Sequence, residues 1–422
     1  MDWSSAYRLF SQKKFDTSKL FNVAVRATVN ELDDDSKIVV SIDDTLLKKT
    51  GRKIPGASWS RDPLGPKFQT NFIWSQRFLQ MSMALPDHNG ISRSRAIPID
   101  FHHCPLAKKP GKNADERARK EYFDQKKKKR LSVQGQQRLN KFRESLDGQG
   151  FKHKEIIACV DNSFTNSEVL KNLPDRSILI GRARKDTKLY EIPDMQAHRG
   201  RKRVYGKLLP TPEQIRQSDQ YCWTQVKAWA AGKEHIFDVK IVKNARWRSA
   251  GEKHVLQVII IRPLGYRLTK QSKMLYREPA YLICTDNNLK IDELLQAYLW
   301  RWEIEVNFRE EKTLLGCGEA QIRNPNSVES VPAFTVAMYS YIQLASYISN
   351  KTNPDLLPRS LWYSKKENER ITTGDMISNL RTQIWSKSIG NNFSGFVDQQ
   401  NKLRSRRNHA DPFTSAVFFC RN

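Results

Sequence analysis

One stretch late in the chain reads Tyr298-Leu-Trp-Arg301-Trp-Glu-Ile-Glu305-Val-Asn-Phe-Arg-Glu-Glu-Lys312. At roughly 100° per residue, four of its side chains would share about 60° of one helix surface: Tyr298, Arg301, Glu305 and Lys312. An adjoining apolar stripe would anchor the helix against a core; its members are Leu295, Leu299, Trp302 and Val306. A carboxylate held among cations on an anchored helix is suited to holding a metal ion beside nucleic-acid phosphate.

The composition of the chain agrees with a polyanionic partner. Lys and Arg number 72 against 45 Asp and Glu, which gives a net charge of +27 and a pI near 9.8. A charge this positive, spread over a long globular chain, indicates binding to nucleic acid. Attachment to an acidic membrane surface is the rival interpretation, but the sequence shows no lipidation signal, amphipathic anchor, signal peptide or apolar run of about 20 residues.

Length and cysteine usage limit the architecture. The 422 residues, 39% of them hydrophobic, are enough for two or three domains, or for one domain with a large insertion. The six cysteines are scattered without a Cys-x-x-Cys pair. This pattern predicts reduced thiols in a cytoplasmic protein.

The periodicity of apolar residues predicts an α/β order of elements. Residues 1–35 should be helical, and residues 186–285 should form strands of a separate small sheet. Between them we expect helices at 114–129 and 136–145, and a β-α-β passage over 155–160, 167–173 and 177–180. Further strands are expected at 37–42, 72–85 and 96–101, and an apolar helix at 328–348, followed by a basic tail.

Three acidic positions stand at the ends of rigid elements. The pair Asp43-Asp44 and the single Asp161 each end an apolar strand, and Glu305 lies on the late helix. Carboxylates delivered this way could bind two divalent metals about 4 Å apart, and oxygen ligands favour Mg²⁺ or Mn²⁺. The simpler alternatives are that the aspartates are turn or N-cap residues, and that Glu305 pairs with Arg301 or Arg309.

The spacing Tyr-x2-Arg-x3-Glu-x6-Lys, carried by the four residues from Tyr298 to Lys312, resembles the YREK signature of bacterial insertion-sequence DDE transposases, the cut-and-paste group that forms DNA hairpins. The resemblance implies an RNase H-like fold, a mixed sheet flanked by helices, with a β-rich insertion between the second Asp and the Glu. It implies a helical N-terminal region, a core in two parts, the insertion, and a basic C-terminal region. The helical N-terminal region would span residues 1–35, and the two parts of the core residues 36–185 and 287–350. The insertion would span residues 186–286 and the basic C-terminal region residues 351–422.

The same resemblance assigns roles to residues. Asp43, Asp161 and Glu305 would be the catalytic, metal-binding triad, with two Mg²⁺ ions that Mn²⁺ can replace. Asp44 stays open as the first acid, because strand alternation lets only one of the pair point at the site. Arg301, Lys312 and Tyr298 would hold the terminal phosphates of the transposon end.

Further DNA contacts are expected from aromatic and basic residues. Tyr281 stands where relatives stack a flipped base, although a core strand aromatic is an equal alternative. Trp247 is a second candidate for stacking, and basic segments lie at residues 48–67, 126–130 and 402–407 and at the run containing Arg201, Lys202 and Arg203. The expected partners are double-stranded DNA, as terminal inverted repeats and target, and a second copy of the chain in a synaptic homodimer. Two alternatives stay open: a catalytically inactive DNA-binding regulator, and a nuclease of the same fold.

Overall fold

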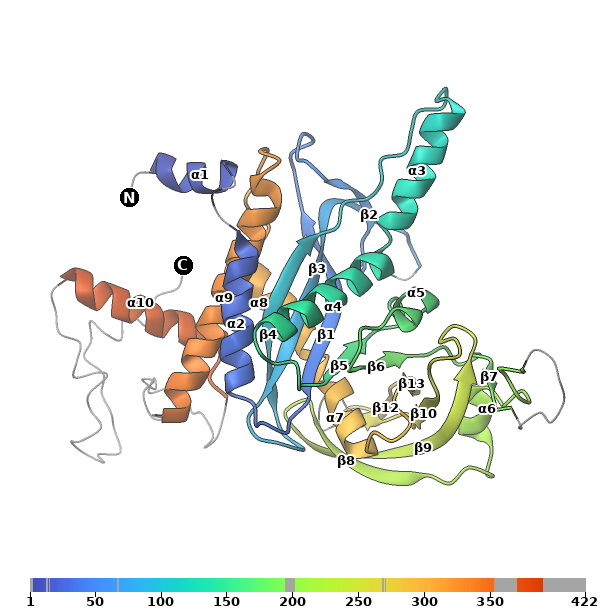
Figure 1. Cartoon of the computed structure of the whole chain (residues 1–422). Helices are drawn as coiled ribbons and strands as arrows, with labels where there is room; N and C mark the ends of the chain where they lie inside the picture. The colour runs from blue at the N-terminus through green and yellow to red at the C-terminus, as the bar shows by residue number, and fades with distance from the viewer. Residues whose placement is uncertain are drawn as a thin grey trace, which may run out of the picture.

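The fold is organised around one large mixed sheet flanked by helices (Figure 1). The computed structural model describes residues 3–12, 14, 16–66, 68–193, 202–267, 269, 271–352 and 370–389. The strands follow the order β2-β3-β1-β5-β6-β13-β10-β9-β7, with β4 paired to β3 and β8 paired to β9. A two-stranded ribbon, β11 with β12, stands apart. The strand bounds are β1 Ile38–Lys48, β2 Ser58–Arg61, β3 Phe72–Pro86, β4 Ser94–His103, β5 Ile156–Val160, β6 Ser177–Arg182, β7 Leu189–Tyr190, β8 Thr224–Ala230, β9 Lys233–Trp247, β10 Leu256–Ile261, β11 Gly265–Tyr266, β12 Leu275–Tyr276 and β13 Ala280–Cys284.

The centre of the sheet is parallel. β1 pairs with β5, and β5 with β6, in parallel registers, while β3 runs antiparallel to β1. Every residue of β5 is buried, as expected for a strand covered on both faces. The expected β-α-β passage at 155–180 and the expected antiparallel pair at 72–101 are confirmed.

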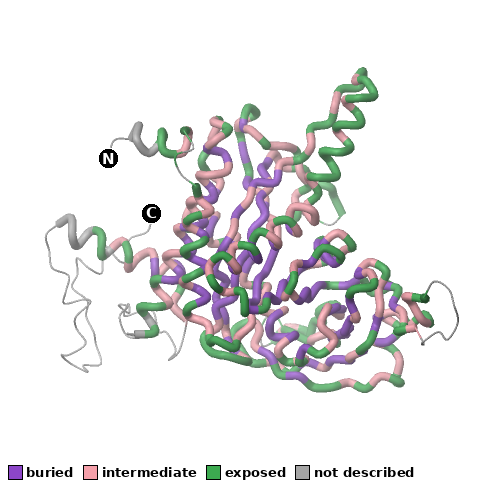
Figure 2. The backbone as a smooth tube through the Cα atoms, in the orientation of Figure 1, coloured by how far each residue is buried: buried purple, intermediate pink, exposed green. Residues whose placement is uncertain are grey.

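Helices cover both faces of this centre (Figures 1 and 2). On one face α2 and α4 pack against Val40 and Ile42 of β1, and on the other α7 packs against Val39. The long α9 lies along α2 and β4. The helix bounds are α1 Trp3–Ser11, α2 Thr17–Asn30, α3 Glu116–Lys128, α4 Leu131–Gly148, α5 Ser167–Lys171, α6 Pro212–Gln217, α7 Ile291–Trp300, α8 Glu303–Thr313, α9 Ser327–Thr352 and α10 Thr373–Ile389. Among the described helices, none is long and apolar enough to cross a membrane.

The prediction of a separate small sheet over residues 186–285 is wrong. β13 pairs antiparallel with β6, through Leu282 with Arg182 and Cys284 with Ile180, and β10 and β9 follow it outward. These strands therefore extend the central sheet. The prediction failed because alternation of apolar residues defines a strand's faces but not the partner at its edge.

The single helix expected from Tyr298 to Lys312 is interrupted. α7 ends at Trp300 and α8 begins at Glu303, and at this junction the backbone N–H groups of residues 301, 302, 304 and 305 bond three residues back, as in Glu305 N–H to Trp302 O at 3.0 Å. This tighter 3₁₀ geometry rotates the chain by about 120° per residue. As a result Trp302 is 59% exposed, so its expected anchoring role is wrong, whereas Leu295 is fully buried as expected.

A glycine fixes how closely α4 approaches the loop after β5. A Cβ at Gly135 would lie 2.7 Å from the ring of Phe164, which is itself buried. We expect Gly135→Ala to lower the free energy of unfolding by about 1–3 kcal/mol through overpacking, measured by urea titration. Gly148→Ala in the same helix meets no atom within 4 Å and is the matched control. It should be neutral or slightly stabilising, and an equal loss in both variants would contradict the packing explanation.

Candidate active site

Strand alternation places Asp43 and Asp44 on opposite faces of the sheet. Val39 and the other odd-numbered core residues of β1 and β5 pack toward α7, whereas Val40 and Ile42 pack toward α4. Asp43 continues the odd series, and its carboxylate pairs with Arg301 at 3.3 Å. Asp44 points to the other face, where Arg77 of β3 is its strongest opposing charge. The α7–α8 side of the sheet thus receives Asp43 rather than Asp44.

Asp43 does not end its strand, contrary to expectation. β1 continues to Lys48 beside β3, in a register that sets Asp43 opposite Gln80. The parallel pairing with β5, however, stops at Ile42 with Val160. Asp43 and Asp161 are therefore the first residues beyond the last paired position of two neighbouring strands, whose backbones are about 4.8 Å apart.

The position of Asp43 raises its pKa. Burial disfavours the carboxylate, Arg301 opposes that effect, and the negative charge of Asp161 adds to it, so the pKa of Asp43 rises to about 7. Burial also raises the pKa of Asp44. The carboxyl groups of Asp43 and Asp161, on adjacent strands, form a place where positive charge is favoured.

Arg301 supplies positive charge from the turn between α7 and α8. Its guanidinium donates to Asp43 Oδ2 and, at 3.1 Å, to Glu305 Oε1, and only 14% of the side chain is exposed. The ring of Tyr298 lies 5.9 Å from the guanidinium, and burial raises the pKa of the Tyr298 hydroxyl. Further along the same face, Lys312 Nζ donates to Thr45 Oγ1 at 2.6 Å. The expected ion pair between Glu305 and Arg301 is thus present.

Asp161 also has the turn role that was the simpler alternative. Its Oδ1 accepts from the backbone N–H of Ser163 at 2.9 Å and from the Ser163 hydroxyl at 2.6 Å. These bonds hold the carboxylate at the start of the loop that leads to α5.

The chemistry of these side chains suits a hard divalent ion. Asp43, Asp161 and Glu305 offer oxygen donors alone, the ligand type that Mg²⁺ and Mn²⁺ prefer. Among the described residues, no three His, Cys, Asp or Glu side chains are gathered as a metal cluster. The guanidinium of Arg301 lies between Asp43 and Glu305 instead. The three acids are suitable ligands for such an ion, and Arg301 contacts two of them, Asp43 and Glu305.

A comparison with protein families bears on this arrangement. The model of the DDE superfamily endonucleases matches residues 2–252, more than half of the chain. The chain belongs to this endonuclease superfamily. The match includes Asp43 and Asp161 and ends before Glu305. No curated protein matches the chain.

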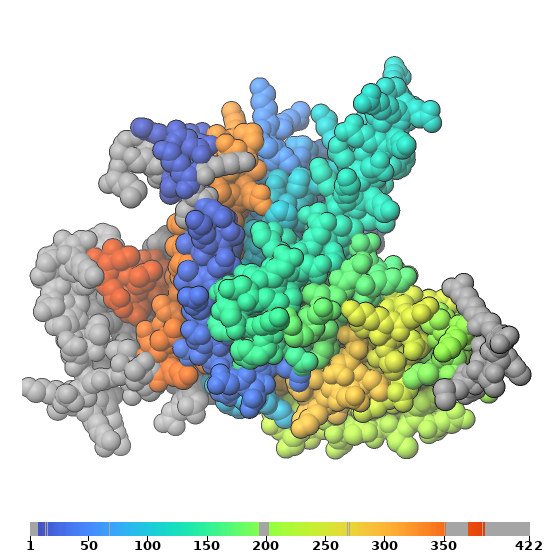
Figure 3. Space-filling model, viewed as in Figure 1, coloured from blue at the N-terminus to red at the C-terminus, as the bar shows by residue number. Residues whose placement is uncertain are grey.

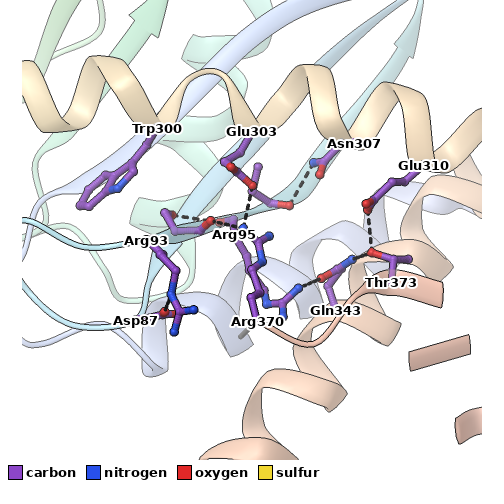
Figure 4. Close-up of polar contacts among 12 residues, drawn as sticks. Asp87, Arg93, Arg95, Trp300, Glu303, Asn307, Glu310, Gln343, Arg370 and Thr373 are labelled. Carbon is purple, nitrogen blue, oxygen red and sulfur yellow. Dashed lines mark hydrogen bonds and ion pairs between the residues drawn. The ribbon is translucent and has the colours of Figure 1, made fainter. Parts of the chain in front are cut away.

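In this DDE endonuclease the rear face of α8 is held by polar contacts (Figure 4). Glu303, Asn307 and Glu310 are spaced i, i+4 and i+7 and point to the same side, roughly opposite Glu305. Glu303 pairs with Arg370 at 2.9 Å, and Asn307 donates to Ala96 O at 3.0 Å. These contacts fix the side of α8 that faces away from Asp43.

Glu310 joins α8 to both C-terminal helices. Its Oε2 accepts from the Tyr339 hydroxyl of α9 at 2.7 Å and from the Thr373 hydroxyl of α10 at 2.6 Å. Arg95 of β4, only 7% exposed, extends the network by donating to Gln343 at 3.0 Å. Sequence reasoning missed these supporting residues. The i, i+4, i+7 spacing of Glu303, Asn307 and Glu310 was the only signal, because their partners are distant in the chain.

The expected DNA-binding residues outside α7 and α8 are scattered. Tyr281 lies within β13, 5% exposed, and its hydroxyl bonds to Glu213, so its surroundings favour the core alternative while its stacking role stays a prediction. Trp247 ends β9 and packs partly buried against the core. Lys202 and Arg203 are exposed, whereas Arg201 and residues 402–407 lie outside the described part of the chain.

Thr373 offers a test of how α8 is held. Thr373→Val removes the hydrogen bond to the Glu310 carboxylate and the one that Gln343 Nε2 donates to the Thr373 hydroxyl, so we expect the free energy of unfolding to fall by about 1.5–3 kcal/mol. Amide hydrogen exchange in α8 should also become faster. Thr313→Val is the matched control, because this exposed hydroxyl bonds only to Arg309 O in its own helix. Faster exchange in both variants would show that Thr373 does not hold α8 in particular.

Glu311 makes the stability depend on pH. It is 1% exposed and bonded to Gln80, and burial raises its pKa to about 8. The folded state therefore binds a proton that the unfolded state releases near pH 4.3, so this group lowers stability as the pH rises from about 4 to about 8. We expect Glu311→Gln to reduce this decline by roughly a few kcal/mol in urea titrations at pH 5 and pH 8.

The control for that measurement is Glu144→Gln on the exposed face of α4. This substitution should leave the pH dependence as in the wild type. A wild-type protein whose stability is the same at both pH values would contradict the prediction for Glu311.

Proposed function

We propose that this chain is a DNA transposase with an RNase H-like core, which binds transposon ends and carries out metal-dependent strand cleavage and strand transfer by a cut-and-paste route. The observation that carries the proposal is the contact of Arg301 with both Asp43 and Glu305, beside Asp161. These acids are spread over more than half of the chain, and the proposal is supported by the contact of Asp43 and Glu305 with one guanidinium and by the effect of Asp161 on Asp43. Membership of the DDE endonucleases supports the same chemistry.

The protein's own residues divide the work. Asp43, Asp161 and Glu305 would hold two Mg²⁺ or Mn²⁺ ions, which supply activation of a water or DNA 3′-hydroxyl and stabilisation of the leaving oxygen. Arg301 has five N–H donors, more than its two carboxylate partners use in the structure, so it can also donate to a phosphate oxygen of the DNA end. Lys312 and Tyr298 lie along the same face and would orient that phosphate.

Several features of the proposal rest on resemblance to YREK transposases. They are the hairpin intermediate, base stacking by Tyr281, DNA contacts by Trp247 and by Arg201, Lys202 and Arg203, and a homodimer on paired inverted repeats. The net charge of +27 supports binding to DNA in general. The expected place of action is the bacterial nucleoid in the cytoplasm.

One observation favours a second candidate function. Arg301 forms ion pairs with both Asp43 and Glu305, so each of these two carboxylates has a partner even when no metal is bound. A DNA-binding regulator derived from a transposase would be stable with such a site. A nuclease of this fold without strand transfer is the third possibility. The DNA products of the reaction distinguish the transposase, the regulator and the nuclease.

The test is a cleavage assay in Mg²⁺ and in Mn²⁺ on DNA carrying the element's ends. We expect Asp43→Asn, Asp161→Asn and Glu305→Gln each to lower the cleavage rate by about 10²-fold or more. Asp44→Asn is the matched control, because Asp44 points to the opposite face, and it should stay within about tenfold of the wild type.

Three results would change the assignment. Binding without metal-dependent cleavage by the wild type would favour the regulator. Cleavage that never yields joined products would favour the nuclease. A severe loss in Asp44→Asn together with an active Asp43→Asn would move the first acid to Asp44.

A further inference from the structure

Helix α3 projects from the body of the protein as an arm (Figures 1 and 2). None of its residues, Glu116–Lys128, is buried. Its N-terminus is capped locally, because the Asp115 carboxylate accepts from Ala118 N–H at 2.8 Å. The helix thus gains little from packing, and isolated helices of about this length are marginal in water. An exposed helix of this kind gains stability when a partner binds along it.

The charge of the arm indicates the partner. Residues 116–130 contain eight Lys and Arg against three Asp and Glu, and Lys126 to Lys129 are consecutive. Four adjacent ammonium groups repel one another around the last turn of the helix and are stabilised by a dense negative charge. Phe123 adds an apolar contact, since its ring is 63% exposed. Closely spaced phosphates joined by apolar sugars match both features.

The base of the arm lies near the loop that follows Asp161. α3 leads directly into α4, and the first turns of α4 pack on the loop that follows Asp161. Gly135 contacts Phe164 there, and Gln136 Nε2 donates to Asn172 O at 3.0 Å. Figure 3 shows the arm standing clear of the remainder of the protein. A helix of 13 residues is about 20 Å long, so the outer end of α3 at Glu116 lies about that far from the lysines, which stand at the end joined to α4.

We propose that α3 grips the phosphate backbone of duplex DNA over a length of about six base pairs, in the part of the duplex beside the phosphate that is cleaved. The number follows from about 20 Å of helix and a rise of about 3.4 Å per base pair. The proposal rests on the proposed function, which supplies the DNA and the position of the cut. In this arrangement α3 sets the direction of the duplex, while the face containing Asp43 and Arg301 receives the phosphate to be cut.

The test uses the full chain and two variants with equal net charge. In the arm variant Lys126, Lys127 and Lys128 are each changed to Gln, which keeps good helix formers. In the matched control Lys19, Lys141 and Lys152, all exposed on or near α2 and α4, are changed to Gln. Binding to a fluorescent duplex of mixed sequence is measured between about 50 and 200 mM salt.

We expect the arm variant to bind about tenfold or more weakly and its slope of log affinity against log salt to fall by up to about 3, at about 0.9 per lost phosphate contact. The control variant should keep the wild-type slope. Hydroxyl-radical footprints should lose protection over a segment of up to about six base pairs beside the cut in the arm variant alone. A double-stranded RNA competitor should displace the duplex less well than DNA does.

A failure of the proposal for α3 can be distinguished from a failure of the proposed function. If the wild type cleaves DNA but the arm variant keeps its slope and footprint, the arm proposal is wrong and the proposed function stands. Equal weakening in both variants also overturns it, because net charge alone then explains the loss. If the arm substitutions weaken RNA binding and spare DNA binding, the assigned partner is wrong. A wild type that neither binds nor cleaves duplex DNA overturns both proposals.

Discussion

The arrangement of the candidate site depends on the contact of one guanidinium with two carboxylates. Arg301 touches Asp43 and Glu305, and so connects the centre of the sheet to the helix that follows it. Without this cation, Asp43 would stand beside Asp161 with its pKa raised by burial and by like charge. Residues 301 and 302 keep helical backbone angles between α7 and α8, and the Arg301 side chain reaches Asp43 of β1 from this turn.

α8 is fixed from two sides by different kinds of contact. Its front face meets β1 through ion pairs and the Lys312–Thr45 bond. Its rear face meets α9 through Asn307 and Glu310, α10 through Glu310, and the segment before α10 through the pair of Glu303 with Arg370. Buried polar networks specify one geometry when every member is bonded, because any alternative leaves a group unpaired. The rear network therefore defines where Glu305 stands relative to the sheet, although none of its residues touches Asp43.

Much of this fold can be read from local pattern, and the limits of that reading are physical. Alternation along β1 and β5 places Asp43 and Asp161, and the helical spacing of Tyr298, Arg301 and Glu305 indicates their common face. The pairing of β13 with β6, the exposed Trp302 and the partners of Glu310 were not predictable in this way. Each depends on which distant segment occupies an edge or a helix face, and neither periodicity nor spacing contains that information.

The continuous sheet restricts how the protein can move. β13 is hydrogen-bonded to β6 at the edge of the central strands. The strands between residues 186 and 286 therefore cannot move as a hinged lid without breaking the backbone hydrogen bonds between β13 and β6. These strands therefore form a fixed surface beside the candidate site and not a domain that closes over it. If a phosphate must be brought to Arg301, the bound polymer would have to bend, and the energy of bending it would then contribute to which sequences bind.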